Sequence, residues 1–179
     1  MSLSAKRKPI NVIQGDFAVS DDREDIMTTV LGSCVAACIF DTRSQVGGLN
    51  HFLLPGDNAG SSTSMSYGLN AMELLINNML KRGASRKRFQ AKLFGGARMI
   101  KGLSDIGEQN AAFALDFLKM EGIPCVSQSL GGTSARRLRF WPATGRVQLR
   151  VLGDVKEMRP ARVKTAVIAP PNASELDLF

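Results

Sequence analysis

The sequence predicts an α/β protein of the α+β kind, a single compact domain in which two main helices flank a mixed or antiparallel sheet. Three observations predict this class. Short apolar runs separated by turn residues are typical of strands, and two longer segments have the periodicity of helices. The chain of 179 residues, 44% of them hydrophobic, has the length and composition of one soluble domain with its own core.

The first half of the chain is expected to be mostly strand. An edge strand is predicted at 10–17, and β-branched or apolar runs at 26–31, 35–40 and 46–54 predict three more. The residues Asp-Thr-Arg-Ser at 41–44 favour a turn, so we expect the last two strands to form a hairpin.

The second half is expected to contain both helices. One is predicted at 67–82, with Gly83 at its C-terminal cap. The other is predicted to run from Asp105, which has capping-box spacing to Glu108, to about Glu121. Further strands are predicted at 89–94, 124–130, 136–141 and 146–152.

The two ends of the chain are expected to lie outside the domain. Residues 1–9 are basic with no apolar stretch after them, which favours a disordered N-terminus over a secretory signal. The domain is expected at 10–152, and the proline-punctuated segment 153–179 is expected to be a C-terminal tail. The three cysteines are odd in number and lack the spacing of a disulfide framework, which favours free thiols in the cytoplasm. No apolar run approaches the ~20 residues that cross a bilayer, so we expect a cytoplasmic monomer with no membrane insertion.

The chain is basic, with a formal net charge of +7 and a pI of about 9.7. Basic residues cluster at 81–88 and at 136–139. Nucleic-acid binding is not expected, because one tryptophan and one tyrosine offer little stacking surface and no nucleic-acid motif is present. The clusters are either a solvated surface or a means of steering the protein towards an acidic partner.

Cys34 and His51 are the candidate catalytic residues. His51 is the only histidine, and a regular hairpin centred between Thr42 and Arg43 would place it directly opposite Cys34, with Cβ atoms about 4.5–5.5 Å apart. A bulge at 47–48 would shift this register by one residue. A thiol becomes a nucleophile when it loses its proton, and a neighbouring imidazole can take that proton.

Residues around this pair predict the rest of the site. A third group usually orients the imidazole, and either Thr28 or Thr29 could do so, since they face opposite sides of one strand. Gly32 and Ser33 interrupt the strand before Cys34 and predict a turn whose backbone N–H groups form an oxyanion hole. The cysteines and the lone histidine lack the spacing and the fourth ligand of a metal site, so no metal or cofactor is expected.

Two loops are candidates for contacting a substrate. The segment 56–66 is polar, rich in small residues and contains Ser61 and Ser62, and it is either a flap or a connector. Gly95 and Gly96 follow a predicted strand, where they either admit a substrate or allow another backbone to come close.

Four segments form a set of motifs. They read T-T-V-L-G-S-C-V at 28–35, G-G-L-N-H-F-L-L-P at 47–55, A-K-L-F-G-G-A at 91–97 and I-G-E-Q-N at 106–110. Together they resemble the CheD family of bacterial chemoreceptor glutamine deamidases over about residues 10–152. The chain departs from the family pattern at Ala135, where a glycine is common after a Gly-Gly pair.

The resemblance implies roles for the site residues. Cys34 would be the nucleophile, His51 the base, and Thr28 the residue that positions the histidine. The implied fold is like the deamidase domain of cytotoxic necrotizing toxins. The implied reaction is hydrolysis of glutamine side chains of methyl-accepting chemotaxis receptors to glutamate through a cysteine acyl-enzyme, without a cofactor.

Two further expectations follow from the resemblance. The acyl-enzyme would also allow hydrolysis of glutamate methyl esters, and a CheC-type phosphatase or another chemotaxis protein would be a further partner. The alternative to an enzyme is a non-catalytic adaptor that binds receptors or other chemotaxis proteins.

Overall fold

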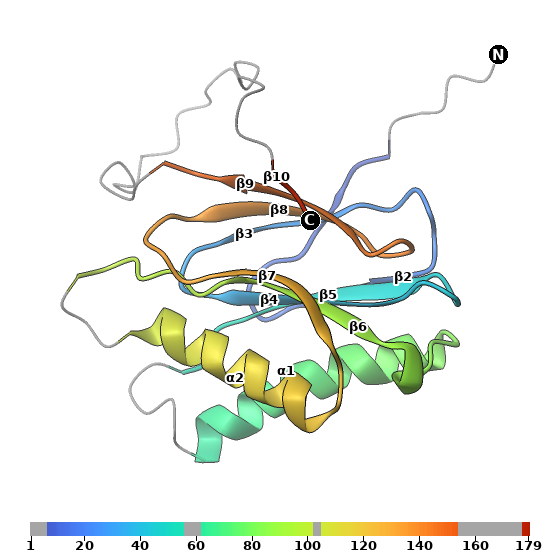
Figure 1. The fold of residues 1–179 in the computed structure, drawn as a ribbon, viewed down its shortest axis with the longest axis horizontal. Coiled ribbons are helices and arrows are strands. Elements are labelled where there is room, and N and C mark those ends of the chain that lie inside the picture. The colour runs from blue at the N-terminus through green and yellow to red at the C-terminus, as the bar shows by residue number, and fades with distance from the viewer. Residues whose placement is uncertain (1–6, 56–61, 102–104, 154–176) are drawn as a thin grey trace.

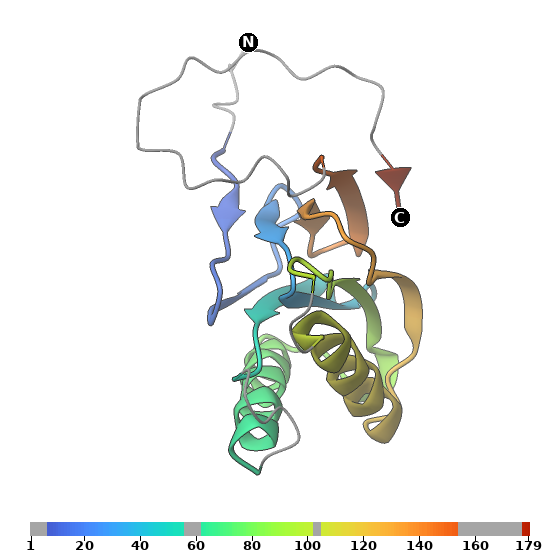
Figure 2. The same ribbon diagram turned by 90° about the vertical axis from the view of Figure 1, so that its left-hand side faces the viewer.

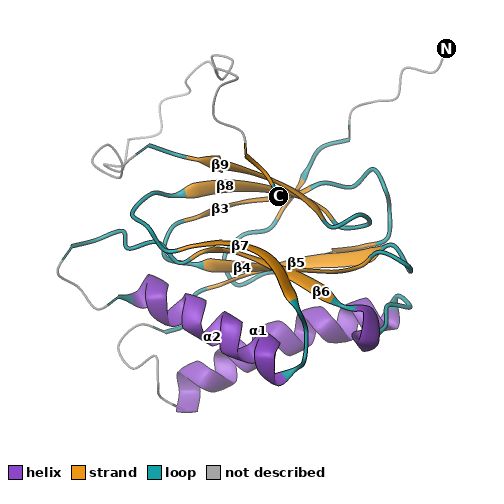
Figure 3. Cartoon of the chain, viewed as in Figure 1, coloured by secondary structure: helices purple, strands orange, loops and turns teal. Residues whose placement is uncertain are grey.

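The computed structural model describes residues 7–55, 62–101, 105–153 and 177–179. Two five-stranded sheets lie one above the other, and two helices cover the far side of one of them (Figure 1, Figure 2). The chain therefore has three layers, two of strands and one of helices (Figure 3). We call the sheet against the helices the inner sheet and the other the outer sheet.

Both sheets are mixed. The inner sheet has the order β2-β5-β4-β6-β7 and the outer sheet the order β1-β3-β8-β9-β10. β1 is parallel to β3 and β6 is parallel to β7, whereas the other neighbours are antiparallel. The inner strands are β2 (Phe17–Ser20), β4 (Val35–Asp41), β5 (Val46–Phe52), β6 (Gln90–Gly95) and β7 (Cys125–Leu130). The outer strands are β1 (Ile10–Asn11), β3 (Met27–Leu31), β8 (Arg136–Trp141), β9 (Arg146–Val151) and β10 (Asp177–Leu178).

The prediction of a single sheet is wrong. β3 belongs to the outer sheet and β4 to the inner sheet, so the short turn at 32–34 carries the chain from one layer to the other. Every residue of β4 and β5 is buried, because these strands lie between the outer sheet and the helices. An apolar run predicts that both faces of a strand are covered, but not which elements cover them.

The predicted edge strand at 10–17 is not continuous, although both of its parts lie at the edge of a sheet. The structure divides it into β1 in the outer sheet and β2 in the inner sheet, joined by the crossing segment 12–16. This segment contains a tight turn in which the Asp16 N–H donates to the Ile13 carbonyl oxygen at 3.0 Å. Gly15 adopts a φ of 91° there, which favours glycine.

Helix α1 (Ser62–Lys81) begins five residues earlier than predicted. Its buried Ser64 donates from the hydroxyl to the Pro55 carbonyl oxygen at 3.0 Å, so a serine-rich segment that reads as loop is accommodated in the helix. Gly68 lets α1 approach its neighbour, because a Cβ there would lie 2.6 Å from the Phe113 ring.

Helix α2 (Ile106–Met120) follows the prediction closely. The Asp105 carboxylate accepts a hydrogen bond from the Glu108 N–H at 2.9 Å and so caps the first turn. The only other helical element in the described part of the chain is the short 3-10 helix η2 (Arg86–Arg88), between α1 and β6.

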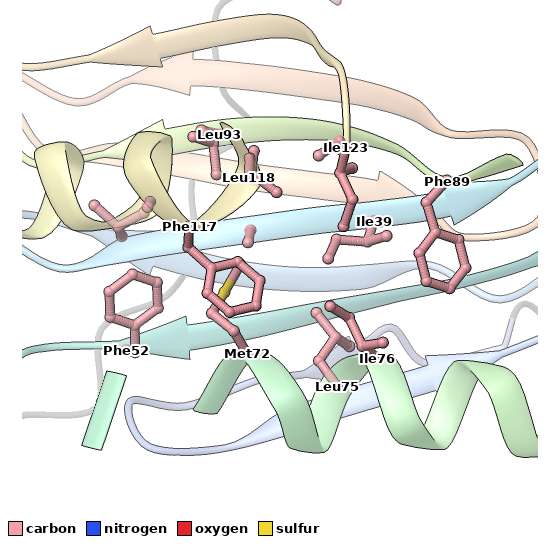
Figure 4. Packing of buried hydrophobic residues seen from close by; sticks show 14 of the residues in the cluster. Ile39, Phe52, Met72, Leu75, Ile76, Phe89, Leu93, Phe117, Leu118 and Ile123 are labelled. Atoms are coloured by element: carbon pink, nitrogen blue, oxygen red, sulfur yellow. The ribbon is translucent and has the colours of Figure 1, made fainter. Parts of the chain in front are cut away.

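Two hydrophobic clusters hold the layers together. The larger lies between the helices and the inner sheet, where side chains of α1 and α2 meet those of β4 and β5 (Figure 4). The labelled members include Ile39, Phe52, Met72, Ile76 and Phe117. The second cluster lies between the two sheets and contains Met27, Leu31, Ala36, Leu49, Leu138 and Phe140, among others.

The last three residues pack on the domain. Asp177 and Leu178 pair with β9, and the Phe179 ring centroid lies 5.8 Å from that of Phe94. No helix among the described residues is long and apolar enough to cross a membrane.

Candidate active site

Three hydrogen bonds hold the turn at 32–34, and each is accepted by a backbone carbonyl oxygen of the turn. The Gly96 N–H donates to the Cys34 carbonyl oxygen at 2.8 Å, and the Ala97 N–H donates to the Gly32 carbonyl oxygen at 2.9 Å. The Asn110 side-chain amide donates to the Ser33 carbonyl oxygen at 2.9 Å. Every carbonyl group of the turn is therefore fixed, which fixes the direction in which Cys34 projects.

Gly95 and Gly96 support this turn rather than lining a substrate loop. Both are buried, and a Cβ on Gly95 would lie 2.1 Å from the Cys34 carbonyl oxygen. Gly95 also adopts a φ of 110°. Of the two alternatives for this glycine pair, the structure therefore supports the close approach of another backbone. Of the other loop candidates, Ser61 lies outside the described residues and Ser62 is the exposed first residue of α1.

The predicted hairpin exists, but its register differs from the expected one. Ala36, not Cys34, is paired with His51. The hairpin connection spans 42–45, with Gln45 at a φ of 59°, and this moves the centre of the turn by one residue. Because Cys34 lies two residues before Ala36, it is on the same face of the sheet as His51, as a diagonal neighbour. Such neighbours are typically about 7–8 Å apart, still within reach of longer side chains.

The two nitrogens of the His51 imidazole have different surroundings. Nδ1 lies 2.9 Å from the Thr29 hydroxyl and 3.2 Å from the Val12 carbonyl oxygen. A carbonyl oxygen only accepts, so Nδ1 carries the proton and Nε2 keeps its lone pair. In the described part of the chain Nε2 is buried without a hydrogen-bond partner. Burial lowers the pKa of His51, although the Val12 carbonyl opposes this, so the neutral base form is favoured.

The threonine that contacts the histidine is Thr29. The Thr28 hydroxyl instead donates to the Leu138 carbonyl oxygen at 2.8 Å, and Thr29 is buried whereas Thr28 is half-buried. The expectation that Thr28 positions His51 is therefore wrong in this structure. The alternation of the strand indicated that only one of the two could face the site, and the family resemblance implied Thr28, the one that does not contact His51.

The Cys34 thiol faces a residue that the sequence analysis did not select. It is half-buried, and Sγ donates to the Gln14 side-chain oxygen at 3.2 Å. Burial raises the pKa of the thiol, while its own backbone N–H acts in the opposite direction. Among the described residues no hydrogen bond joins Cys34 to His51, and burial shifts both pKa values in the direction that favours a neutral thiol and a neutral imidazole.

Asn110 is a further site residue that the sequence analysis missed. It is fully buried on α2 and accepts a hydrogen bond from the Leu54 N–H at 2.8 Å while donating to the Ser33 carbonyl oxygen. It therefore ties the end of the histidine strand to the cysteine turn. The sequence did indicate that Asn110 has a structural role, because a polar residue on the apolar face of an amphipathic helix must find hydrogen-bond partners when it is buried.

Among the described residues, the remaining cysteines and acidic residues form no second site. Burial raises the pKa values of Cys38 and Cys125, and Cys38 is fully buried in the core. Within the described residues, no group of three or more histidine, cysteine, aspartate or glutamate side chains could hold a metal ion.

Two solved structures show a distant likeness. A Neisseria meningitidis protein described by the family model DUF152 matches with a TM-score of 0.44 and 14% identity, over 65% of this chain and 53% of that one. The hypothetical protein YfiH of Bacillus licheniformis matches with a TM-score of 0.42 and 14% identity, over 64% and 50%. The likeness to a toxin deamidase domain stays a prediction.

Sequence relatives cover almost the whole chain. A protein of Caulobacter sp. (strain K31) named "Probable chemoreceptor glutamine deamidase CheD" is 51% identical over 173 residues, which is 95% of this chain and 92% of the relative. One of the same name from Agrobacterium fabrum (strain C58 / ATCC 33970) is 44% identical over 180 residues, 99% of each chain. The family model "CheD chemotactic sensory transduction" matches residues 53–151. The chain therefore belongs to the CheD family.

Proposed function

We propose that this hydrolase deamidates glutamine side chains of chemoreceptors, with Cys34 as the nucleophile and His51 as the base. The observation that carries the proposal is the state of His51. Its Nδ1 is bound by Thr29 and Val12, and Nε2 has no hydrogen-bond partner among the described residues, on the sheet face that also carries Cys34. The names of the relatives supply the substrate class.

The first half of the reaction forms a thioester. His51 Nε2 removes the thiol proton as Sγ of Cys34 attacks the carboxamide carbon of the substrate. The resulting imidazolium then gives the proton to the departing nitrogen, so that ammonia leaves. In the second half, the same Nε2 removes a proton from water, and the hydroxide cleaves the thioester to glutamate and a free thiol.

Backbone N–H groups of the turn would stabilise the oxyanion. The carbonyl oxygens of Gly32, Ser33 and Cys34 all accept hydrogen bonds from other parts of the chain. In the same turn, the N–H groups of Ser33 and Cys34 have no acceptor on another described residue. Fixed donors of this kind are typically worth about 10²–10³ in kcat.

The same intermediate can form from a glutamate methyl ester. The carbonyl carbon, the thiolate and the oxyanion donors are unchanged, and methanol leaves in place of ammonia. We therefore expect methyl ester hydrolysis as a second activity of Cys34.

Mass spectrometry of a receptor fragment tests the proposal. Each conversion of a carboxamide to a carboxyl group adds about one mass unit, so incubation with the protein should give a stepwise mass gain that maps to glutamines. Binding of the fragment with no gain in mass would contradict the proposal and support the non-catalytic adaptor.

Removing the Thr29 hydroxyl should slow the reaction. Thr29→Val keeps the side-chain shape but frees Nδ1 on one side, and loss of orientation at a catalytic group can cost about 10²-fold in rate. The matched control is Thr28→Val, which removes a hydroxyl bonded to Leu138 on the opposite face and should leave kcat nearly unchanged. Steady-state kinetics together with thermal unfolding would separate a loss of orientation from a loss of stability. Normal turnover by Thr29→Val beside a slow Thr28→Val would contradict the assignment.

The pKa directions of the two groups set the expected pH profile. Burial lowers the pKa of His51, so the neutral base persists in more acidic solution, and we expect kcat/KM to fall only below the ordinary histidine value of about 6.5. Burial raises the pKa of Cys34, so its alkylation by iodoacetamide should still be rising above pH ~8.5. An acid limb of kcat/KM near or above pH 7 would be inconsistent with a buried neutral base.

The two basic clusters have different surroundings. In the 81–88 cluster, three arginines form ion pairs with described acidic residues: Arg82 with Asp21, Arg86 with Glu73 and Glu121, and Arg88 with Asp41. In the other cluster, Arg136 is buried and donates to the carbonyl oxygens of Gly95 and Gly131. Arg136 therefore supports the site from within the domain and is not part of the surface that either alternative for this cluster requires.

Four arginines on the outer sheet are available to an acidic partner. The basic face consists of Arg137, Arg139, Arg146 and Arg150, none of which forms an ion pair with a described residue. Arg139 and Arg146 lie over the Trp141 ring, at 5.8 and 4.6 Å from its centroid. Arg137 is paired with both Val30 and Arg150, close to the end of β3 that leads into the cysteine turn.

Reversing charge on this face should slow receptor turnover. We expect Arg137→Glu with Arg150→Glu to lower kcat/KM on an acidic receptor fragment about 10-fold at low salt. The difference should shrink as the Debye length falls from about 10 Å at 0.1 M to about 3 Å at 1 M salt. Lys87→Glu, on the exposed surface after α1, is the control and should have little effect. A salt-independent kcat/KM for the unmodified protein would contradict electrostatic steering.

A further inference from the structure

Gln14 presents a glutamine carboxamide to the candidate nucleophile. Its side-chain oxygen accepts a hydrogen bond from Sγ of Cys34 at 3.2 Å, although the two residues are 20 positions apart. Gln14 is exposed, so its side chain has space to turn. A carboxamide in front of the thiol is the group that the proposed reaction consumes.

The backbone on both sides of Gln14 is fixed to the strand that carries the base. The Gly15 N–H donates to the His51 carbonyl oxygen at 2.7 Å, and the His51 N–H donates to the Asp16 carbonyl oxygen at 3.0 Å. Ile13 and Asp16 close the tight turn that has Gln14 at its tip. The chain therefore holds this carboxamide beside the thiol and near the imidazole without any encounter in solution.

We propose that Gln14 is a modification site, at which Cys34 deamidates the protein's own chain. This inference rests on the proposed function, because it uses the same nucleophile and base. Rotation about the side-chain bonds of Gln14 would turn its carbonyl carbon, in place of its oxygen, towards Sγ. Holding two reacting groups in one molecule replaces an encounter with a rotation, which is worth a large effective concentration.

The chemical balance is that of ordinary amide hydrolysis. Sγ forms a bond to Cδ of Gln14 as His51 Nε2 takes the thiol proton, and the C–N bond then breaks as the proton passes to the nitrogen. Ammonia leaves, and an internal thioester joins Cys34 to residue 14. Water attacks that thioester, the C–S bond breaks, and the products are a glutamate at position 14 and the free thiol.

The modification would change the site that performs it. Before the reaction, the carboxamide of Gln14 occupies the position that a receptor glutamine must take in front of the thiol. After the reaction, a carboxylate lies beside Cys34, and a neighbouring negative charge disfavours a thiolate. The protein with glutamate at position 14 should therefore be alkylated more slowly than the unmodified protein.

Peptide mapping by mass spectrometry tests the proposal. The protein is incubated together with a receptor fragment, and the peptide containing Gln14 and the receptor peptides are analysed from the same sample. We expect the Gln14 peptide of the unmodified chain to gain about one mass unit in a fraction that rises with time. The same peptide should stay unchanged in Cys34→Ala, which controls for spontaneous deamidation.

Matched variants make the assignment specific. Gln14→Met keeps the length of the side chain but has no carboxamide, so the intact chain should lose its self-modification while the receptor is still deamidated. Gln109→Met replaces an exposed glutamine of α2 and should leave the modification of Gln14 intact. Gln14→Met should also increase the alkylation rate of Cys34, because the thiol loses the carboxamide oxygen that accepts its hydrogen bond.

The outcomes separate this inference from the proposed function. Receptor glutamines that are converted while Gln14 remains intact would overturn self-deamidation and leave the proposed function standing. An equal mass gain at Gln14 in the unmodified chain and in Cys34→Ala would also overturn it, since the change would be spontaneous. Conversion of neither the receptor nor Gln14 would overturn both.

Discussion

Cys34→Ala should abolish receptor deamidation while leaving the fold intact. Removing the nucleophile of an acyl-enzyme mechanism typically lowers kcat by at least ~10³-fold, whereas the half-buried thiol makes one side-chain hydrogen bond, to Gln14. The change in the free energy of unfolding should stay below about 1 kcal/mol. Receptor mass spectrometry measures the activity, and chemical unfolding measures the stability.

Cys38→Ala is the matched control for this prediction. Cys38 is fully buried in the cluster between the sheets, so its truncation should lower stability by about 1 kcal/mol through a small cavity. Activity per folded molecule should remain. If both variants lost activity and stability together, destabilisation and not the loss of a nucleophile would be the cause.

Gly95→Ala should have the largest effect on stability and should remove activity as well. The new Cβ would lie 2.1 Å from the Cys34 carbonyl oxygen, at a φ of 110°. The neighbour that must move is backbone, in the turn that aims the nucleophile. We expect a loss of about 4 kcal/mol or more in the free energy of unfolding, and low activity even where the chain is folded.

Gly83→Ala separates the clash from the backbone strain. Gly83 adopts a similar φ of 93°, but a Cβ there meets nothing within 4 Å. The strain alone should cost about 1–2 kcal/mol, and activity should be normal. Equal losses of stability in the two variants would mean that the contact between Gly95 and the cysteine turn is unimportant.

Local features of the structure were predictable from the sequence. The Asp105 cap depends on the first residues of α2, and the hairpin of β8 and β9 depends on alternation and on a turn ending in Gly145. In both cases the physical cause lies within a few residues along the chain. The start of α1 is an exception, because the burial of Ser64 against Pro55 overrides the weak helix propensity of a serine-rich segment.

The relation between the site residues was less predictable. Cys34 and His51 were identified, but their alignment depends on the length of the hairpin connection, and Gln45 in a left-handed conformation shifts it by one residue. The choice between Thr28 and Thr29 depends on which side of β3 faces the inner sheet. The division into two sheets has no local pattern in the sequence, and neither has the crossing segment that places Gln14 beside Cys34. Both are determined by contacts between distant parts of the chain.

Competition by hydroxylamine tests the central claim most directly, because it detects the acyl group on Cys34. A thioester can be captured by hydroxylamine in place of water, so receptor glutamines should acquire a hydroxamate, about sixteen mass units heavier than the amide, in a fraction that rises with hydroxylamine concentration. Cys34→Ala should give neither hydroxamate nor glutamate. Formation of glutamate alone at every hydroxylamine concentration, or undiminished turnover by Cys34→Ala, would contradict an acyl-enzyme at Cys34.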